Sequence, residues 1–486
     1  MKLKSLVREN NSLVPVEIEI TLLPGLPTIQ FLGLPDQIIK ESIHRIKSAI
    51  RQQGFEFPRA QQVFVNIRPN HLKKSSRGLE LAVAAGILWE TGEVPPPPLP
   101  EKFYIYGELG LSGDVFEPED LASDFEGSEE CHVLTGTLSS LCCPFPRRVV
   151  HELKNLAQPV FHPPEMKTLK VERPQEGLDF YYTEEQAKVL SVVALGGHSL
   201  LLAGPSGSGK TTMAKALPAL MSEPRPEEIL EIKKINKDLH DGDSLWRPVI
   251  HPHHSSTPLA LIGGGVPPKP GELSRAHRGL LILDELLEFD PKVQETLREP
   301  MEEGALRLSR GTRAVKYPAM AQVVATTNLC PCGDFTPGNK PSCRFSKHRC
   351  QSYSQRLSGP VIDRFEILHF SQLQRRRAGD PATHGLIRGD EILAQVSEAR
   401  AWMRERGRNN TPNSRRPIAE LEGEWDSFFF EHMMNRDLGS HRRYQATLRV
   451  ARSFADLERV ENVQGRHFDL ALNITWKPFE KLKRWD

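Results

Sequence analysis

An eight-residue stretch, residues 204–211, has the chemistry needed to hold a triphosphate. Its sequence, GPSGSGKT, fits G-x-x-x-x-G-K-[ST] at every fixed position and lies between an apolar run and a helical pattern. Glycines let backbone N–H groups turn toward phosphate oxygens, and the start of the next helix adds positive potential. Lys210 can reach the β- and γ-phosphates, and the Thr211 hydroxyl can ligate Mg²⁺. We therefore expect ATP and Mg²⁺ to bind here. The expected nucleotide-binding residues are Gly204, Pro205, Ser206, Gly207, Ser208, Gly209, Lys210, Thr211 and Thr212.

Two carboxylates follow a second apolar run. Residues 280–283 are typical of a central strand, and Asp284 and Glu285 come at its carboxyl end, where α/β sheets bind ligands. We expect Asp284 to hold Mg²⁺ through water and Glu285 to polarise the attacking water. A third apolar strand, residues 322–327, ends in Asn328, which could orient that water beside the γ-phosphate. Together these residues predict ATP hydrolysis.

Arginines downstream are candidates for contacts with the γ-phosphate. Residues 356–365 place an arginine after a helix, where it could reach the nucleotide of a neighbouring subunit and stabilise transition-state charge. The alternative is an ion pair with Asp363 in the same chain. Residues 440–457 form a helical pattern. We expect a C-terminal helical lid over the nucleotide, with Arg442 near the phosphates.

Four of the seven cysteines lie close together in a segment rich in Gly, Pro and Lys. Four thiolates suit tetrahedral Zn²⁺, and His348 could replace one of them. Because the spacing is not that of two C-x-x-C pairs, a set of reduced thiols is the alternative. The candidate zinc ligands are Cys330, Cys332, Cys343 and Cys350.

Residues 305–310 and 313–317 flank Gly311 and Thr312 and predict a β-hairpin with alternating basic side chains. A projecting basic hairpin suits a nucleic-acid backbone, although a solvated hairpin face fits the pattern equally well. Upstream, the insertion 225–278 carries histidines that could bind metal, but a hydrogen-bonded loop is the favoured interpretation. The DNA candidates are Arg310, Arg313 and Lys316; the histidines are His251, His253 and His254.

Composition restricts the class of protein. The 486 residues carry a formal net charge of +1, so bulk charge implies neither a nucleic-acid nor a membrane partner. No apolar run approaches ~20 residues, which predicts no membrane span. Residues 1–10 lack the apolar segment of a secretory signal. We expect a cytoplasmic protein.

The elements that position these residues predict three α/β or helical domains. An α/β domain over 1–172 contains expected strands at 14–20, 62–67 and 104–109 and helices at 37–53 and 79–90. A P-loop domain with a central parallel sheet follows over 173–373, and a helical lid over 374–486. Serines beside lysines at 73–76 could form a Ser–Lys dyad. A polar loop capping the helix at 79 is the favoured interpretation.

With these residues in place, the whole chain resembles the YifB/ComM family of magnesium-chelatase-like AAA+ ATPases. The resemblance is carried by ordered motifs: GLPD at 33–36, GFEFP at 54–58, GEL at 107–109, PHHS at 252–255, GGG at 263–265, PGE at 270–272, LDEL at 283–286, EFD at 288–290, LREP at 297–300, CPCG at 330–333 and RLSGP at 356–360. The chain departs from the family at Leu287, where proline is usual, and at Leu329, inside the usual Asn-Pro-Cys-Pro-Cys-Gly run. Its last two cysteines are also further apart than usual.

The resemblance implies a first domain of the ChlI type, similar in fold to the Lon protease domain. The Ser–Lys pair of Lon is not convincingly present, which argues against proteolysis. The resemblance also implies a ring, expected to have six subunits, with ATP at the subunit interfaces. In that ring Asn328 would be sensor 1, Arg364 the trans-acting finger and Arg442 sensor 2.

Members of the ComM type are associated with helicase-like branch migration of DNA during natural transformation, which would place the basic hairpin in the ring's pore. We therefore expect an ATP-driven motor that acts on single-stranded or branched DNA. One alternative is a chelatase-like ATPase that remodels a protein partner and has no protease activity of its own. A Lon-like peptidase using Ser75 or Ser76 is a third hypothesis.

Overall fold

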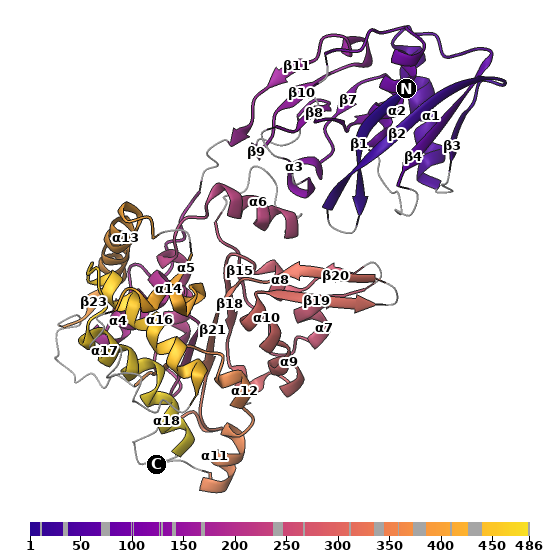
Figure 1. Cartoon of the computed structure of the whole chain (residues 1–486). Helices are drawn as coiled ribbons and strands as arrows, with labels where there is room; N and C mark the ends of the chain where they lie inside the picture. Colours follow the sequence, from indigo (N-terminus) through magenta and orange to yellow (C-terminus); the bar gives the residue numbers. More distant parts are fainter. Residues whose placement is uncertain are drawn as a thin grey trace. The chain divides into compact units, whose positions relative to one another are not determined.

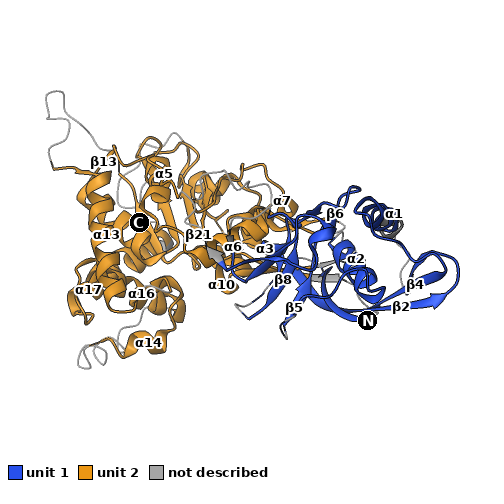
Figure 2. Cartoon of the chain, turned by 90° about the horizontal axis from the view of Figure 1, so that it is seen from above, with its two compact units in different colours: residues 1–170, 237–243 blue, residues 171–236, 244–486 orange. Residues whose placement is uncertain are grey.

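The computed structural model describes residues 1–9, 12–32, 37–69, 78–98, 100, 102–125, 127, 130–138, 142–166, 171–236, 246–265, 268–310, 313–334, 345–357, 359–372, 385–408, 411–425 and 440–484. The described part divides into two compact units, one within residues 1–170 and one over 171–236 and 244–486 (Figure 2). The proposed dyad, Ser75 and Ser76 with Lys73 and Lys74, lies outside the described residues.

The first unit is a mixed sheet covered by helices. Its strands lie in the order β11-β10-β8-β5-β1-β2-β4-β3, antiparallel among β1, β2 and β4 and parallel from β1 through β5 and β8 to β10. Helix α2 (Leu79–Glu90) is buried from Leu79 through Trp89, because its small apolar side chains pack directly on the sheet. The strand bounds are β1 (Lys2–Glu9), β2 (Ser12–Pro24), β3 (Ile29–Leu32), β4 (Gln61–Arg68), β5 (Phe103–Ile105), β8 (His132–Thr135), β10 (Arg147–Val149) and β11 (Val160–His162).

One carboxylate is held inside this first unit. Glu80 of α2 is 1% exposed and accepts hydrogen bonds from Ser42 Oγ at 2.7 Å, Arg45 Nη1 at 3.1 Å and the Leu109 N–H at 3.0 Å. Ser42 and Arg45 belong to helix α1 (Gln37–Gln52). A buried charge is tolerated when it is paired and hydrogen-bonded, so this carboxylate ties the two helices and the strand β6 (Glu108–Leu109) together. The expected likeness of this unit to the Lon protease domain stays a prediction.

The second unit contains a five-stranded parallel sheet in the order β15-β18-β21-β14-β22, of which β15, β18 and β21 are labelled in Figure 1. Its three central strands are short, apolar runs that are buried on both faces, as parallel strands between helices are. The register pairs Leu200 with Val324 and with Ile367, so the strands end at one common edge. The bounds are β14 (Leu200–Ala203), β15 (Val249–Ile250), β18 (Leu280–Leu283), β21 (Gln322–Thr327) and β22 (Ile367–Phe370).

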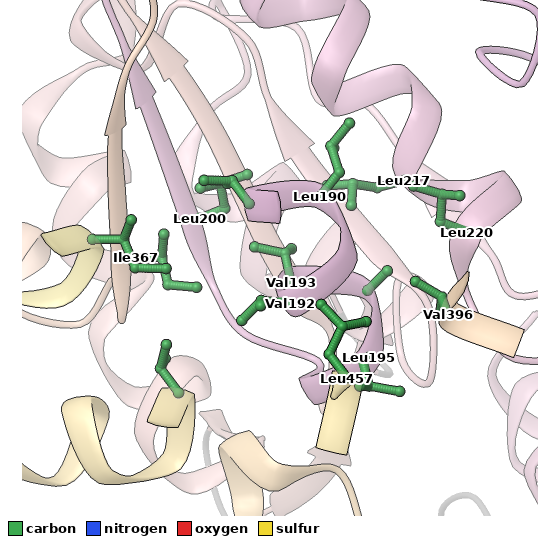
Figure 3. Packing of buried hydrophobic residues seen from close by; sticks show 14 of the residues in the cluster. Leu190, Val192, Val193, Leu195, Leu200, Leu217, Leu220, Ile367, Val396 and Leu457 are labelled. Carbon is green, nitrogen blue, oxygen red and sulfur yellow. The ribbon is translucent and has the colours of Figure 1, made fainter. Parts of the chain in front are cut away.

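The C-terminal helices share a hydrophobic core with this sheet. Helix α4 (Glu184–Gly196) lies between them, and Val192 and Val193 pack with Leu200 of the sheet, while Val396 and Leu457 of the lid belong to the same cluster (Figure 3). The predicted α/β architecture with a central parallel sheet and C-terminal helices is confirmed. The division into domains at 172/173 and 373/374 stays a prediction. The lid helices are α13 (Gly389–Glu405), α14 (Ile418–Glu422), α16 (His441–Leu457), α17 (Gly465–Thr475) and α18 (Lys477–Arg484).

The insertion upstream of β18 contains more regular structure than its sequence indicated. Helix α6 (Pro226–Ile235) begins with a proline at its first turn, and β15 pairs with β18 as an edge strand of the central sheet. The predicted hairpin is confirmed, with β19 (Ala305–Arg310) antiparallel to β20 (Arg313–Pro318). No helix in the described ranges is long and apolar enough to cross a membrane.

Candidate nucleotide site

Three neighbouring strands bring the predicted site residues to one edge of the sheet. Gly204 follows β14, Asp284 and Glu285 follow β18, and Asn328 follows β21. Because these strands are parallel and in register, their carboxyl ends meet, and the loops there form the usual ligand crevice of an α/β sheet. The structure therefore brings together, at one edge of the sheet, the residues expected to bind the triphosphate, which lie up to 124 residues apart in the sequence.

The phosphate-binding loop joins β14 to helix α5 (Lys210–Leu220). Its first glycine is required by a close approach: a Cβ on Gly204 would lie 2.3 Å from the backbone oxygen of Ser371. Gly209 caps α5 with a φ of 82°, in the left-handed region that favours glycine. Ser208 Oγ donates to the Pro205 carbonyl at 2.8 Å, which holds the turn closed. The loop is thus fixed around the N-terminus of α5, where an anion is favoured.

The Lys210 ammonium group lies at the centre of this loop. Its Nζ donates to the carbonyl oxygens of Gly204 at 2.9 Å and Pro205 at 2.7 Å and to Asn328 Oδ1 at 3.0 Å, and the residue is 8% exposed. Burial lowers the pKa of Lys210, and the nearby Asp284 and Glu285 carboxylates act in the opposite direction. The structure thus brings Lys210 and Asn328 together at the position where phosphate oxygens would bind.

The Asp284 carboxylate and the Thr211 hydroxyl lie side by side. Thr211 Oγ1 donates to Asp284 Oδ1 at 3.2 Å, and Asp284 is exposed to solvent at the strand end. A hydroxyl and a carboxylate oxygen are hard ligands of the kind that Mg²⁺ prefers, with its remaining positions filled by water and phosphate. The donor set therefore fits a nucleotide-bound Mg²⁺.

Glu285 has an unusual backbone conformation. Its φ of 55° and ψ of 54° are left-handed, which costs a residue other than glycine roughly 1–3 kcal/mol. The conformation is stabilised by a hydrogen bond from its N–H to Thr326 Oγ1 at 3.0 Å. Strain of this kind is concentrated at functional sites, so it agrees with a role for Glu285 in the reaction.

Thr326 is a site residue that the sequence interpretation missed. Its hydroxyl accepts from the Glu285 backbone N–H and donates to Asp284 Oδ1, so one side chain on β21 holds the Asp284 carboxylate and the backbone of Glu285 just after β18. The only signal in the sequence is a pair of threonines at the end of an otherwise apolar strand, directly before Asn328.

The cysteine segment contacts the phosphate-binding loop. The Ser206 N–H donates to the Gly333 carbonyl at 2.9 Å, which joins the Cys-Pro-Cys-Gly turn to the loop. The sulfur atoms of Cys330 and Cys332 are 2.7 Å apart, and both residues share a hydrophobic cluster with Cys350 of helix α11 (Lys347–Ser354). The fourth candidate, Cys343, lies outside the described residues. Among those described, no group of three or more His, Cys, Asp or Glu is arranged to hold a metal.

Arg364 and Arg442 lie together, but away from the phosphate-binding loop. Both pair with the Glu302 carboxylate, Arg364 through Nη2 at 2.9 Å. Asp363 pairs with Arg443 at 4.0 Å, and Arg364 pairs with Glu302, so the described residues do not show the alternative ion pair between Arg364 and Asp363. The two arginines line a cavity of about 330 Å³. Its other walls come from the amino ends of the strands and from the lid: Gly197, Ser199, Met301, Ala321, Gln322, Val323, Glu366, Ser414, Arg415, Gln445, Ala446 and Arg449.

This placement corrects the interpretation that Arg442 lies near the phosphates of its own chain. Ser199 and Glu366 line the cavity and directly precede β14 and β22, whereas the phosphate-binding loop follows β14. The four residues of β14 span about 13 Å, so the two sites lie at opposite ends of the sheet. The lid helices share a hydrophobic core with α4, and this packing places Arg442 at the amino edge of the sheet.

The remaining candidates lie on the insertion and the hairpin. Lys316 is exposed on β20, and the side chains of Arg310 and Arg313 lie outside what the structure describes. The histidine segment is a hydrogen-bonded turn, as favoured: His253 Nδ1 lies 2.7 Å from Ser255 Oγ, and the Ser256 N–H donates to the His253 carbonyl at 2.8 Å.

Comparisons with known proteins agree with this geometry. Three family models match in chain order: the subunit ChlI of Mg-chelatase at residues 17–123, the magnesium chelatase subunit ChlI at 179–377 and the magnesium chelatase subunit ChlI C-terminal region at 388–475. The competence protein ComM of Haemophilus influenzae is 31% identical over 491 residues, 94% of each chain. The uncharacterized protein YifB of Escherichia coli is 30% identical over 505 residues, covering 96% of this chain and 95% of its own. An uncharacterized protein of Mycobacterium tuberculosis is 33% identical over 469 residues, covering 91% and 92%.

Proposed function

Since the chain belongs to the YifB/ComM family of magnesium-chelatase-like proteins and is therefore an AAA+-type ATPase, we propose that it is a ComM-like DNA motor. ATP hydrolysis would drive helicase-like branch migration of single-stranded or branched DNA in recombination or natural transformation. The observation that carries the ATPase part is the convergence of Lys210, Asp284, Glu285 and Asn328 at one sheet edge. The DNA part rests on the basic hairpin and on the competence protein among the relatives.

Each residue of the site has a distinct task in hydrolysis. Lys210, released from the loop carbonyls, would bind the β- and γ-phosphate oxygens, and Asn328 would hold the attacking water beside them. Thr211 and Asp284 would hold Mg²⁺, which neutralises charge that develops on the phosphates. Glu285, whose backbone N–H is held by Thr326, would accept the proton of the attacking water. This set of residues would support the hydrolysis of ATP as well as its binding.

The placement of Arg364 and Arg442 leads us to propose that each nucleotide is completed by a neighbouring chain. The cationic cavity lies at the amino edge of the sheet and the nucleotide would bind at the carboxyl edge, so the cavity of one chain can face the nucleotide of the next. Such head-to-tail contacts produce a closed ring when the rotation between successive subunits adds up to a full turn. AAA+ proteins commonly form oligomeric rings, and we propose six subunits here. Arg364 would then act as a trans-acting finger, Arg442 as sensor 2 and Asn328 as sensor 1.

DNA-stimulated ATP hydrolysis tests the proposed function. We expect single-stranded or forked DNA to raise the ATPase rate of the full chain, with a steep loss of stimulation as salt rises, because phosphate contacts release counterions. Lys316→Glu should weaken that stimulation, since Lys316 is exposed on the hairpin, whereas Lys292→Glu on helix α9 (Pro291–Thr296) should not. An ATPase that ignores every DNA structure would contradict the DNA motor.

The same experiment distinguishes the DNA motor from the alternative function. The alternative is a chelatase-like ATPase that remodels a protein partner and has no protease activity of its own, and the three magnesium chelatase family models support only its chelatase-like part. Under that function, ATP hydrolysis would respond to a protein fraction and not to DNA. Neither outcome changes the ATPase assignment, because both motors use the same nucleotide site.

We also propose that the cysteine segment binds structural Zn²⁺. Thiolate ligands suit zinc, and the sulfur atoms of Cys330 and Cys332 lie 2.7 Å apart; Cys350 and Cys343, the latter outside the described residues, would complete the ligand set. Metal analysis of purified protein should find one zinc per chain, and removal by a chelator should weaken ATP binding, because the Cys-Pro-Cys-Gly turn bonds to Ser206 of the phosphate-binding loop. If the purified protein lacks stoichiometric zinc and still binds ATP fully, the cysteines are reduced thiols and the zinc proposal is wrong.

A further inference from the structure

The Glu302 carboxylate lies between two cationic side chains from different parts of the second unit. Its Oε1 is 2.9 Å from Nη2 of Arg364, which precedes β22, and also bonds Nη2 of Arg442 on the lid helix α16. The Arg364 side chain is 7% exposed, while those of Glu302 and Arg442 are partly open to solvent. One carboxylate facing two guanidinium groups leaves the cluster formally positive.

Glu302 also lies at the base of the basic hairpin. It belongs to helix α10 (Arg298–Glu303), which ends at Gly304 in a left-handed conformation with φ 64°, and β19 begins at the next residue. The Ala319 N–H, just after β20, donates to the Gly304 carbonyl at 2.8 Å. Arg415, from the segment before the lid helix α14, donates to the Met301 carbonyl at 3.4 Å. The last turn of α10 is therefore tied to the core, to the lid and to both ends of the hairpin.

We propose that Glu302 is a positioning residue that holds Arg364 and Arg442 until the γ-phosphate of a neighbouring subunit's ATP takes its place. The inference rests on the proposed function, in which these arginines act in trans. Two guanidinium groups repel each other unless an anion lies between them, and a phosphate offers more charge and more acceptor oxygens than one carboxylate. Glu302 thus occupies, within its own chain, the position that the γ-phosphate of the neighbouring subunit's ATP would take between the two arginines.

The exchange of anions also connects the nucleotide to the hairpin. When the arginines move to the neighbour's phosphate, Glu302 is released, and the base of β19 and β20 loses its ion pairs with Arg364 and with the lid residue Arg442, while the bonds to the Gly304 and Met301 carbonyls remain. The hairpin then becomes more mobile in the chain whose arginines are engaged. Nucleotide state in one subunit would in this way control the hairpin of the next.

Three variants of the full chain test the inference. Glu302→Gln keeps the size of the side chain but removes the charge that opposes transfer of the arginines. Glu302→Asp keeps the charge, and Glu299→Gln, on the same helix and exposed, makes the same charge change away from the arginines. The readouts are the protein concentration that gives half-maximal ATPase activity per chain and backbone hydrogen exchange over residues 305–318 without nucleotide.

The Glu302→Gln chain should reach half-maximal activity at about five-fold lower protein concentration, the effect of one partly exposed ion pair, and its hairpin should exchange faster. The Glu302→Asp and Glu299→Gln chains should resemble the wild type in both readouts. A Glu302→Gln chain that matches Glu299→Gln in either readout overturns the inference. If wild-type activity per chain does not depend on protein concentration, the proposed trans site itself fails, which is a separate outcome.

Discussion

Replacing Arg364 with alanine is expected to lower the turnover number of ATP hydrolysis by about 10³-fold or more, while the affinity of the chain for ATP stays unchanged. A fixed guanidinium stabilises the charge that spreads over the transferring phosphoryl group. Because Arg364 lies at the amino edge of the sheet and the phosphate-binding loop at the carboxyl edge, its removal should leave ATP binding by its own chain intact. Steady-state hydrolysis and fluorescent-nucleotide titration measure the two quantities.

The control for this prediction is an arginine of the lid that lies outside the cavity. Arg466 on α17 pairs with Glu458 at 2.7 Å and is exposed, so Arg466→Ala should keep most of the activity. If the Arg364→Ala chain hydrolyses ATP at nearly the wild-type rate, the cavity at the amino edge has no part in the reaction. If it loses ATP binding instead, Arg364 acts on the nucleotide of its own chain.

Replacing Glu285 with glutamine is expected to lower the turnover number by about 10²- to 10⁴-fold and to leave ATP binding intact. Glutamine keeps the shape of the side chain and the backbone N–H that donates to Thr326, but it cannot accept a proton from water. The variant should therefore retain ATP in the assembled state. Rapid-quench hydrolysis beside an ATP-binding isotherm separates the chemical step from binding.

Glu288 provides the matched control for Glu285. It lies three residues further along the chain, and its carboxylate accepts from the Tyr353 hydroxyl at 2.7 Å and forms no hydrogen bond or ion pair with the described loop at 204–211. Glu288→Gln makes the same change of charge and should cost far less activity. Turnover within ten-fold of the wild type in Glu285→Gln would mean that another group activates the water.

Residues fixed by local spacing could be predicted from the sequence. The loop at 204–211, the carboxylates after 280–283 and Asn328 after 322–327 each follow an apolar run that parallel strands require. Parallel register then brings them together without further information. The helix at 79–90 was predicted with the bounds that the structure shows, because a short apolar run with small residues can pack on a sheet over its whole length.

Features that depend on partners remote in sequence could not be predicted. The expected strand at 104–109 is interrupted, because the Gly107 N–H donates to the Gly78 carbonyl at 2.8 Å instead of continuing the ladder. The two residues of β15 are too few for a periodic signal and became a strand only through pairing with β18. The positions of Thr326 and Glu302 likewise follow from contacts with distant segments, and no local pattern marks them.

The position of Arg442 also depends on a packing partner that is remote in sequence. Its place at the start of a C-terminal helix predicted a lid, but the direction in which that lid packs is set by the hydrophobic face of α16 against α4. Amphipathic spacing identifies the buried face of a helix without naming the surface that buries it. The arginine therefore reached the amino edge of the sheet, beside Arg364, and not the phosphates of its own chain.

In the proposed ring, one chain binds the triphosphate through Lys210 and the next chain completes the site through Arg364. Mixing inactive Lys210→Ala and Arg364→Ala chains in equal amounts tests it most directly, by the rate of ATP hydrolysis. Random assembly gives about a quarter of head-to-tail interfaces an intact Lys210 on one side and an intact Arg364 on the other. The mixture should therefore recover activity on that scale. An assembled mixture that is as inactive as its two components would mean that Arg364 does not complete the site of the neighbouring chain.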